Sequence, residues 1–172
     1  MFEINYRIIP HEWDEFKGQE GYIQFCVNGY IYGDMYSKDL DGVMDTEDLN
    51  AWFDRICRAL YYLEIKNYVV LSDIESNNVW IEFKRMNDDV IISILDNEKM
   101  SGVKDVELVM KNPTIHSRYW GNQIVPYDEL KRQVISTIKG YIEFLNMNNQ
   151  YDLMFRDLIN DYNKLLEKLI DK

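Results

Sequence analysis

The chain has 172 residues, of which 47% are hydrophobic and 14% are aromatic. So much apolar side chain excludes a disordered protein and predicts one globular domain over residues 1–172, with a core of its own. The formal net charge of −11 argues against nucleic-acid binding, because a surface of that sign repels phosphate.

The sequence offers no targeting or membrane segment. The first residues lack the basic stretch and apolar run of a secretory signal. No stretch approaches the roughly 18 apolar residues that a membrane helix needs. Cys26 and Cys57 stand in apolar contexts, where reduced thiols are expected. We therefore predict a cytoplasmic protein that does not bind membranes.

Strand patterns come first along the chain. Residues 2–9 alternate in part and are closed by Pro10, which predicts a first strand. Residues 21–36 alternate around Asn28-Gly29, a dipeptide that favours a tight hairpin turn. The arms of this hairpin are expected at residues 22–27 and 30–35.

From Asp45 the apolar residues recur with the period of a helix. Asp45 or Thr46 is expected to cap this helix, and Glu47 and Asp48 should lie in its first turn, where the helix dipole favours acids. Its buried face is predicted to contain Leu49, Trp52, Phe53, Ile56, Leu60 and Leu63.

The second half of the chain returns to strands and then closes with helices. Strand patterns cover residues 67–74, 78–86, 89–96 and 106–112. Residues 113–126 begin and end with proline and are expected to be irregular. Residues 127–147 and 151–172 are predicted to form two antiparallel helices joined by a short link, the second of which could be an appended element.

Together these elements predict an α+β fold. We expect an antiparallel β-sheet of about five to seven strands, with a helix after the first hairpin and two C-terminal helices packed on one face.

The stretch SKDLDGVMDTED, residues 37–48, follows much of the register of an EF-hand calcium loop. Asp39, Asp41, Asp45 and Asp48 take the third, fifth, ninth and twelfth places. Ser37 replaces the first acid, however, and aspartate replaces the usual final glutamate. Since a strand hairpin precedes the stretch, we favour an acidic turn leading into a helix, and calcium binding stays open.

Two features point to protein binding. Tyr119 and Trp120 follow Arg118 between two prolines, and these residue types are enriched at binding hot spots; alternatively, Trp120 covers the core. An acidic run containing Lys38 as its one basic residue could also attract a basic partner. Its members are Asp34, Asp39, Asp41, Asp45, Glu47 and Asp48.

Catalytic signals are sparse. The sequence lacks the usual zinc, acyl-transfer and phosphate-binding motifs, and nothing in it calls for a cofactor. Residues that could support acid–base chemistry are His11 and His116, and two carboxylate pairs that could face one another across strands, Asp73 with Glu75 and Glu82 with Asp96.

The order of elements resembles immunity proteins of bacterial polymorphic-toxin and contact-dependent inhibition systems. The resemblance covers about residues 20–147 and rests on the segments YIQFCVNGYIYG, EDLNAWFDRICRALYYL, NNVWIEFKRM, DDVIISI and YDELKRQVISTIKGYIEFL. It implies a small acidic cytoplasmic protein that neutralises a cognate toxin, often a basic nuclease. Such inhibitors act by occlusion and need no catalytic residue.

The leading hypothesis is therefore a non-enzymatic inhibitor that binds a basic protein through residues 34–48, with Tyr119 and Trp120 as further contacts. One alternative is an enzyme or a ligand- or metal-binding domain that uses carboxylates and a histidine. Another is a homodimer joined through the C-terminal helices, whose apolar seam includes Phe155, Leu158, Leu165 and Leu169.

Overall fold

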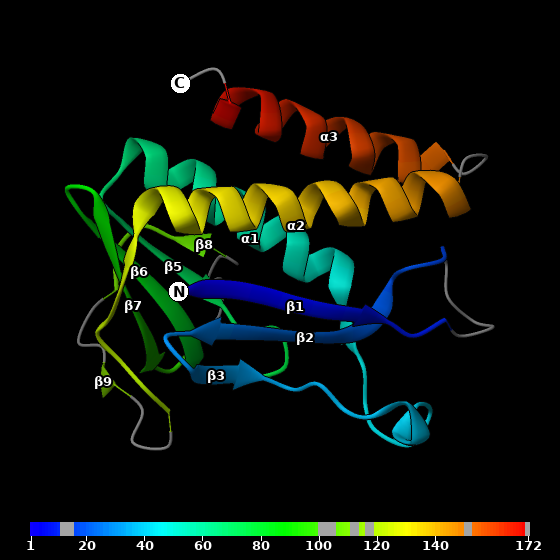
Figure 1. The fold of residues 1–172 in the computed structure, drawn as a ribbon, viewed down its shortest axis with the longest axis horizontal. Helices are drawn as coiled ribbons and strands as arrows, with labels where there is room; N and C mark the ends of the chain where they lie inside the picture. Colours follow the sequence, from blue (N-terminus) through cyan, green and yellow to red (C-terminus); the bar gives the residue numbers. More distant parts are fainter. Residues whose placement is uncertain (11–15, 100–105, 111–113, 116–118, 150–152, 171–172) are drawn as a thin grey trace.

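Two antiparallel sheets form the strand layer of the molecule (Figure 1). The computed structural model describes residues 1–10, 16–99, 106–110, 114–115, 119–149 and 153–170. The first sheet has the order β1-β2-β3, and β4 pairs with β2. Its strands are β1 (Phe2–Ile8), β2 (Glu20–Val27), β3 (Tyr30–Gly33) and β4 (Glu47–Asp48).

The second sheet has the order β10-β7-β6-β5-β8, with β9 paired to β7. Its strands are β5 (Tyr68–Ser72), β6 (Val79–Met86), β7 (Asp89–Asp96), β8 (Val106–Glu107), β9 (Thr114–Ile115) and β10 (Gln123–Pro126). The predicted α+β class is confirmed, but the strands are divided between two sheets instead of lying in one.

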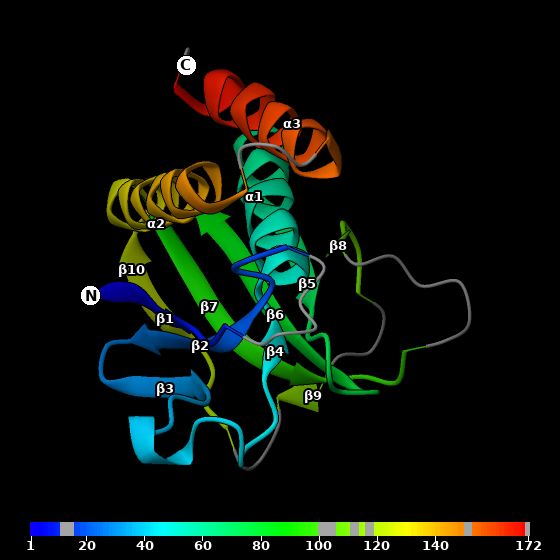
Figure 2. The same cartoon turned by 90° about the vertical axis from the view of Figure 1, so that its right-hand side faces the viewer.

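Helices cover one side of this strand layer (Figure 2). α1 (Leu49–Ile65) and α2 (Tyr127–Asn148) contact the strands, and α3 (Leu153–Ile170) lies over α1 and α2. α2 and α3 run antiparallel, as predicted (Figure 1). A short 3-10 helix, η1 (Lys38–Leu40), interrupts the loop after β3. Among the described residues, no helix is long and apolar enough to cross a bilayer.

One main core joins both sheets to the helices. The predicted apolar face of α1 is confirmed, because all six of its residues are buried. The same cluster includes Phe25 from the first sheet, Ile81 from the second, and Ile138 and Leu169 from α2 and α3. The two sheets are therefore held by packing against shared helices as well as by their own hydrogen bonds.

The start of α1 differs from the prediction. Asp48 caps the helix, and its Oδ1 accepts a hydrogen bond from the backbone N–H of Ala51 at 2.8 Å. The predicted caps, Asp45 and Thr46, are wrong because pairing with β2 keeps Glu47 and Asp48 extended. The helix can begin only after this pairing ends.

Two further predictions need correction. Residues 113–126 are not wholly irregular, because β9 and β10 both pair with β7. The strand expected at residues 106–112 is reduced to β8, which pairs with β5. Residues 111–113 and 116–118 lie outside the described part of the chain.

The predicted seam of the last helix is used within the chain. Leu169 is buried, and Leu158 and Leu165 are partly buried against the main core. The side chain of Phe155 lies outside the described residues. Because α3 already packs on α1 and α2, these leucines do not form an open apolar face. Dimerisation through the C-terminal helices stays a prediction.

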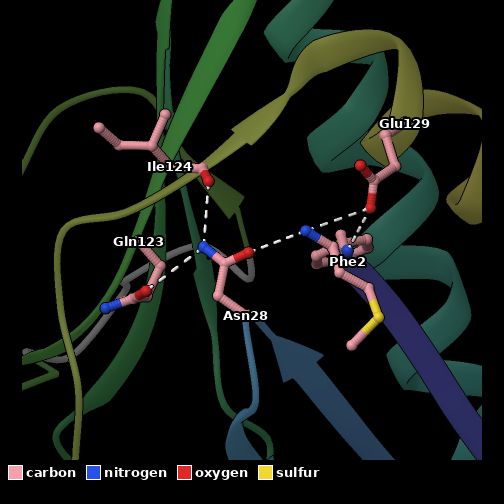
Figure 3. Close-up of polar contacts among 6 residues, drawn as sticks. Phe2, Asn28, Gln123, Ile124 and Glu129 are labelled. Carbon is pink, nitrogen blue, oxygen red and sulfur yellow. Dashed lines mark hydrogen bonds and ion pairs between the residues drawn. The ribbon is translucent and has the colours of Figure 1, made fainter.

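The predicted Asn28-Gly29 hairpin is confirmed, and both turn residues have positive φ, 52° and 87°. Figure 3 shows that the Asn28 side chain also joins separate elements. Its Nδ2 donates to the carbonyl oxygen of Ile124 at 3.0 Å, and its Oδ1 accepts from the Met1 amine at 2.8 Å. Glu129 of α2 accepts from the backbone N–H of Phe2 at 2.6 Å.

We expect Asn28→Ala to lower the free energy of unfolding by about 2 kcal/mol, because alanine is strained at positive φ and cannot make these hydrogen bonds. Asn28→Gly should cost about 1 kcal/mol, since glycine loses the hydrogen bonds without the strain. Urea denaturation measures both. Equal losses would show that the left-handed conformation contributes nothing to the difference.

Candidate binding face

A cleft of about 480 Å³ opens where the end of β3 meets β4 and the connection between β5 and β6. Four carboxylates line it, and they come from segments far apart in the sequence. They belong to Asp34, Glu47, Asp73 and Glu75. We call this hollow the acidic cleft.

Asp73 is fixed in the acidic cleft by short hydrogen bonds. The Tyr32 hydroxyl donates to its Oδ2 at 2.5 Å, and the backbone N–H of Ser76 donates to its Oδ1 at 2.6 Å. Burial raises the pKa of Tyr32 far above its usual value, and the Asp73 carboxylate raises it further. The tyrosine therefore stays protonated as a donor, and Asp73, 8% exposed, serves as a structural anchor.

The backbone beside Asp73 is held by two cations. Lys99 Nζ donates to the carbonyl oxygens of Asp73 and Ser76. Arg55 donates to the carbonyl oxygen of Ser72 at 2.9 Å. Burial lowers the pKa of Lys99, against the opposite effect of the Asp73 carboxylate. These contacts fix the β5–β6 connection and so fix the position from which Glu75 extends.

Glu47 is the most strongly perturbed carboxyl group of the acidic cleft. Burial raises its pKa to about 7, against the lowering effect of the hydrogen bond that Trp52 Nε1 donates at 2.9 Å. The other three carboxylates of the cleft raise this pKa further. The shift therefore comes mainly from burial of the Glu47 carboxyl group, with a smaller contribution from the neighbouring negative charges.

A pH-dependent stability follows from this raised pKa. Glu47 ionises near pH 4.5 in the unfolded chain but near 7 in the folded chain, so its ionisation removes stability as pH rises through this interval. We expect Glu47→Gln to stabilise the protein by about 1 to 2 kcal/mol at roughly pH 8, after allowance for partial exposure, with little effect near pH 5. Glutamine can still accept the hydrogen bond from Trp52.

Thermal denaturation of the variant across this range measures the effect. Asp157→Asn is the matched control, because it removes the same charge from an exposed position on α3. A gain for Glu47→Gln that did not change with pH would contradict the raised pKa.

The members of the predicted acidic run lie in different surroundings, and their role in partner binding stays a prediction. Asp34 and Glu47 line the acidic cleft, whereas Asp39 and Asp45 are exposed on the loop outside its lining. Asp41 Oδ2 is 2.6 Å from Arg7 Nη1, which joins the loop to β1. The sixth member of the run, Asp48, is the cap of α1.

The calcium register is divided in the same way. The ion pair of Asp41 and the capping role of Asp48 take two of its carboxylates away from a shared centre. Within the described ranges, no group of three or more His, Cys, Asp or Glu side chains is arranged to hold a metal ion. His11 and His116 lie outside those ranges.

The two carboxylate pairs have different outcomes. Asp73 and Glu75 both line the acidic cleft. Glu82 and Asp96 do not face each other, because Glu82 pairs with Ser93 and Asp96 with Val79 in the β6–β7 register. Glu82 is 2% exposed, and its Oε1 lies 2.9 Å from Lys84 Nζ.

A second hollow of about 530 Å³ adjoins the acidic cleft, and polar and apolar atoms contribute equally to its surface. We call it the apolar hollow after its four large side chains; the full lining is Gly29, Tyr30, Ile31, Tyr119, Trp120, Gly121 and Gln123. Ile31 and Tyr119 line both, so the two depressions lie side by side. Tyr30 and Ile31 are 50% and 52% exposed, and Tyr119 is 36% exposed. The acidic cleft and this apolar hollow together form what we call the binding face.

Trp120 lies at the back of the apolar hollow and belongs to the main core, with 7% exposure. Its Nε1 donates to the carbonyl oxygen of Ile31 at 2.9 Å, and its own carbonyl oxygen accepts from the Ile94 N–H at 3.0 Å. It therefore joins the first sheet to the second. The alternative that Trp120 covers the core is therefore confirmed. Of the two aromatic residues, Tyr119 is the one whose side chain is exposed.

No protein-family model, no curated protein and no solved structure matches the chain. The resemblance to immunity proteins stays a prediction from the order of the elements.

Proposed function

We propose that the chain is a non-enzymatic binding protein that captures a basic protein partner at the acidic cleft. The observation that carries this proposal is the convergence of four carboxylates on one open cleft of a chain with net charge −11. Negative potential in a cleft attracts cationic side chains and raises the rate of encounter.

The buried and the exposed carboxylates of the acidic cleft have different roles. Asp73 is held by hydrogen bonds from Tyr32 and the Ser76 backbone, so it provides a fixed carboxylate at the base of the cleft. Glu47, whose pKa is near 7, is only partly ionised at neutral pH and adds little to this charge. Glu75 is exposed and can meet an approaching arginine or lysine. Fixed acceptors lose little conformational entropy on binding, which favours affinity.

The order of the elements resembles that of immunity proteins, and on this basis we propose the biological role of the binding. The chain would be an immunity-type inhibitor that neutralises a cognate toxin in the bacterial cytoplasm. Inhibition would be by occlusion, because a bound acidic domain covers the basic surface with which a nuclease holds its substrate. This role requires no cofactor or catalytic residue of the inhibitor.

The test is a capture experiment with the purified chain in lysate of its own organism, at low and at high salt. We expect a stoichiometric basic partner at low salt that is released as salt rises, because screening weakens exposed charge pairs. The purified partner should lose its activity when the chain is added. Retention of a partner that is neither basic nor salt-sensitive would contradict the proposal.

One observation favours a second candidate, a ligand-binding or enzymatic role for the acidic cleft. A carboxyl group with pKa near 7, such as Glu47, beside other carboxylates is suited to proton transfer. The two candidates differ in one variant. Glu47→Gln should leave partner capture nearly unchanged if the chain is an inhibitor, but should abolish turnover if the chain is an enzyme.

A further inference from the structure

The apolar hollow leaves large side chains at the surface. Tyr30, Ile31 and Tyr119 are between 36% and 52% exposed, and they lie on adjacent segments around one depression. These exposed side chains provide apolar surface that a partner could bury.

The hollow is also rigid. The β2–β3 register holds Tyr30 opposite Val27 and Ile31 opposite Cys26. Trp120 is tied to both sheets by its two hydrogen bonds. At the other end, the Asn28 side chain binds the backbone of Ile124 (Figure 3). A preformed hollow needs little ordering when a ligand binds, which favours a specific contact.

Charge complementarity indicates what occupies the hollow. One wall, formed by Ile31 and Tyr119, separates it from the four carboxylates of the acidic cleft. A purely apolar ligand would contact only the hollow, and a purely basic ligand would contact only the acidic cleft. A segment that carries both kinds of side chain close together matches the whole.

We propose that the apolar hollow receives an apolar side chain of the partner, next to the basic side chain that enters the acidic cleft. This inference rests on the proposed function and specifies the segment that is recognised. In an extended segment, residues two positions apart point to the same side and are about 7 Å apart. An extended segment with a basic and an apolar residue separated by one residue presents both side chains on one side, and this is the pattern to be tested.

The test uses two short synthetic peptides with blocked ends and equal charge, titrated into the isotopically labelled full chain and followed by amide chemical shifts. In the first peptide, lysines are separated by three serines. In the second, leucine replaces the middle serine of each group. We expect both peptides to shift amides of the cleft, including Glu75 and Ser76, and only the leucine peptide to shift Tyr30 and Gly121 of the hollow. Leucine should tighten binding about tenfold through burial of its side chain.

Tyr30→Thr should remove the gain from leucine and leave the affinity for the serine peptide unchanged, because Tyr30 lines the hollow but not the acidic cleft. Ile124→Thr is the matched control, because Ile124 is 57% exposed but does not line the hollow. Equal affinity for the two peptides, with shifts confined to the cleft, would overturn this inference and leave the proposed function intact. Shifts in neither depression would overturn both.

Discussion

Reversal of the two exposed charges of the acidic cleft, in the double variant Asp34→Lys/Glu75→Lys, should weaken partner capture by about 100-fold at low salt. Both side chains are exposed and line the cleft, so their replacement should leave the fold intact. Lysines at these positions would repel a basic partner, and most of the loss should lie in the association rate. Surface plasmon resonance with the captured partner at two salt concentrations measures it.

The matched control is Asp157→Lys/Glu167→Lys, which changes the net charge equally but at exposed positions of α3. α3 and β3 lie on opposite sides of the molecule (Figure 1). If capture depended on net charge alone, the two double variants would weaken it alike. Our account expects the α3 variant to stay within a few-fold of wild type.

Trp120→Ala should lower the free energy of unfolding by about 3 to 5 kcal/mol, because it removes a large core side chain that also bonds the first sheet. Tyr119→Ala should cost only about 1 kcal/mol, since Tyr119 is partly exposed and lies outside the main core; it loses its ring contact with Tyr32, 5.1 Å between centroids. Chemical denaturation measures both values.

Trp120→Phe separates the two contributions of the tryptophan. It keeps most of the apolar volume and removes the hydrogen bond to the Ile31 carbonyl oxygen, so it should cost about 1 to 2 kcal/mol. A ranking in which Tyr119→Ala is the most destabilising of the three would contradict the assignment of Trp120 to the core and Tyr119 to the surface.

Local patterns in the sequence predicted most of the elements. Asn28-Gly29 indicated its hairpin because few other residues adopt positive φ at both turn positions. The apolar face of α1 was also predictable, since a helix brings residues three and four positions apart onto one side. Such signals depend on neighbours in the chain, and here the local structure and the tertiary fold agree.

What the sequence did not predict depends on long-range contacts. The two sheets are brought together by packing against shared helices, and the cap of α1 depends on the pairing of Asp48 with Glu20. Tyr32 and Asp73, 41 residues apart, meet in the acidic cleft. The sequence identified Asp34 and Glu75 as members of different groups, and no local pattern indicates that the fold brings them together.

The central claim is that a partner binds at the acidic cleft and the adjoining apolar hollow. Amide hydrogen exchange of the chain, alone and with its captured partner, tests this claim most directly. We predict slower exchange in the complex at residues 31–34, 73–79 and 119–121, with little change over α3. Protection confined to α2 and α3, with the cleft segments unchanged, would contradict the account.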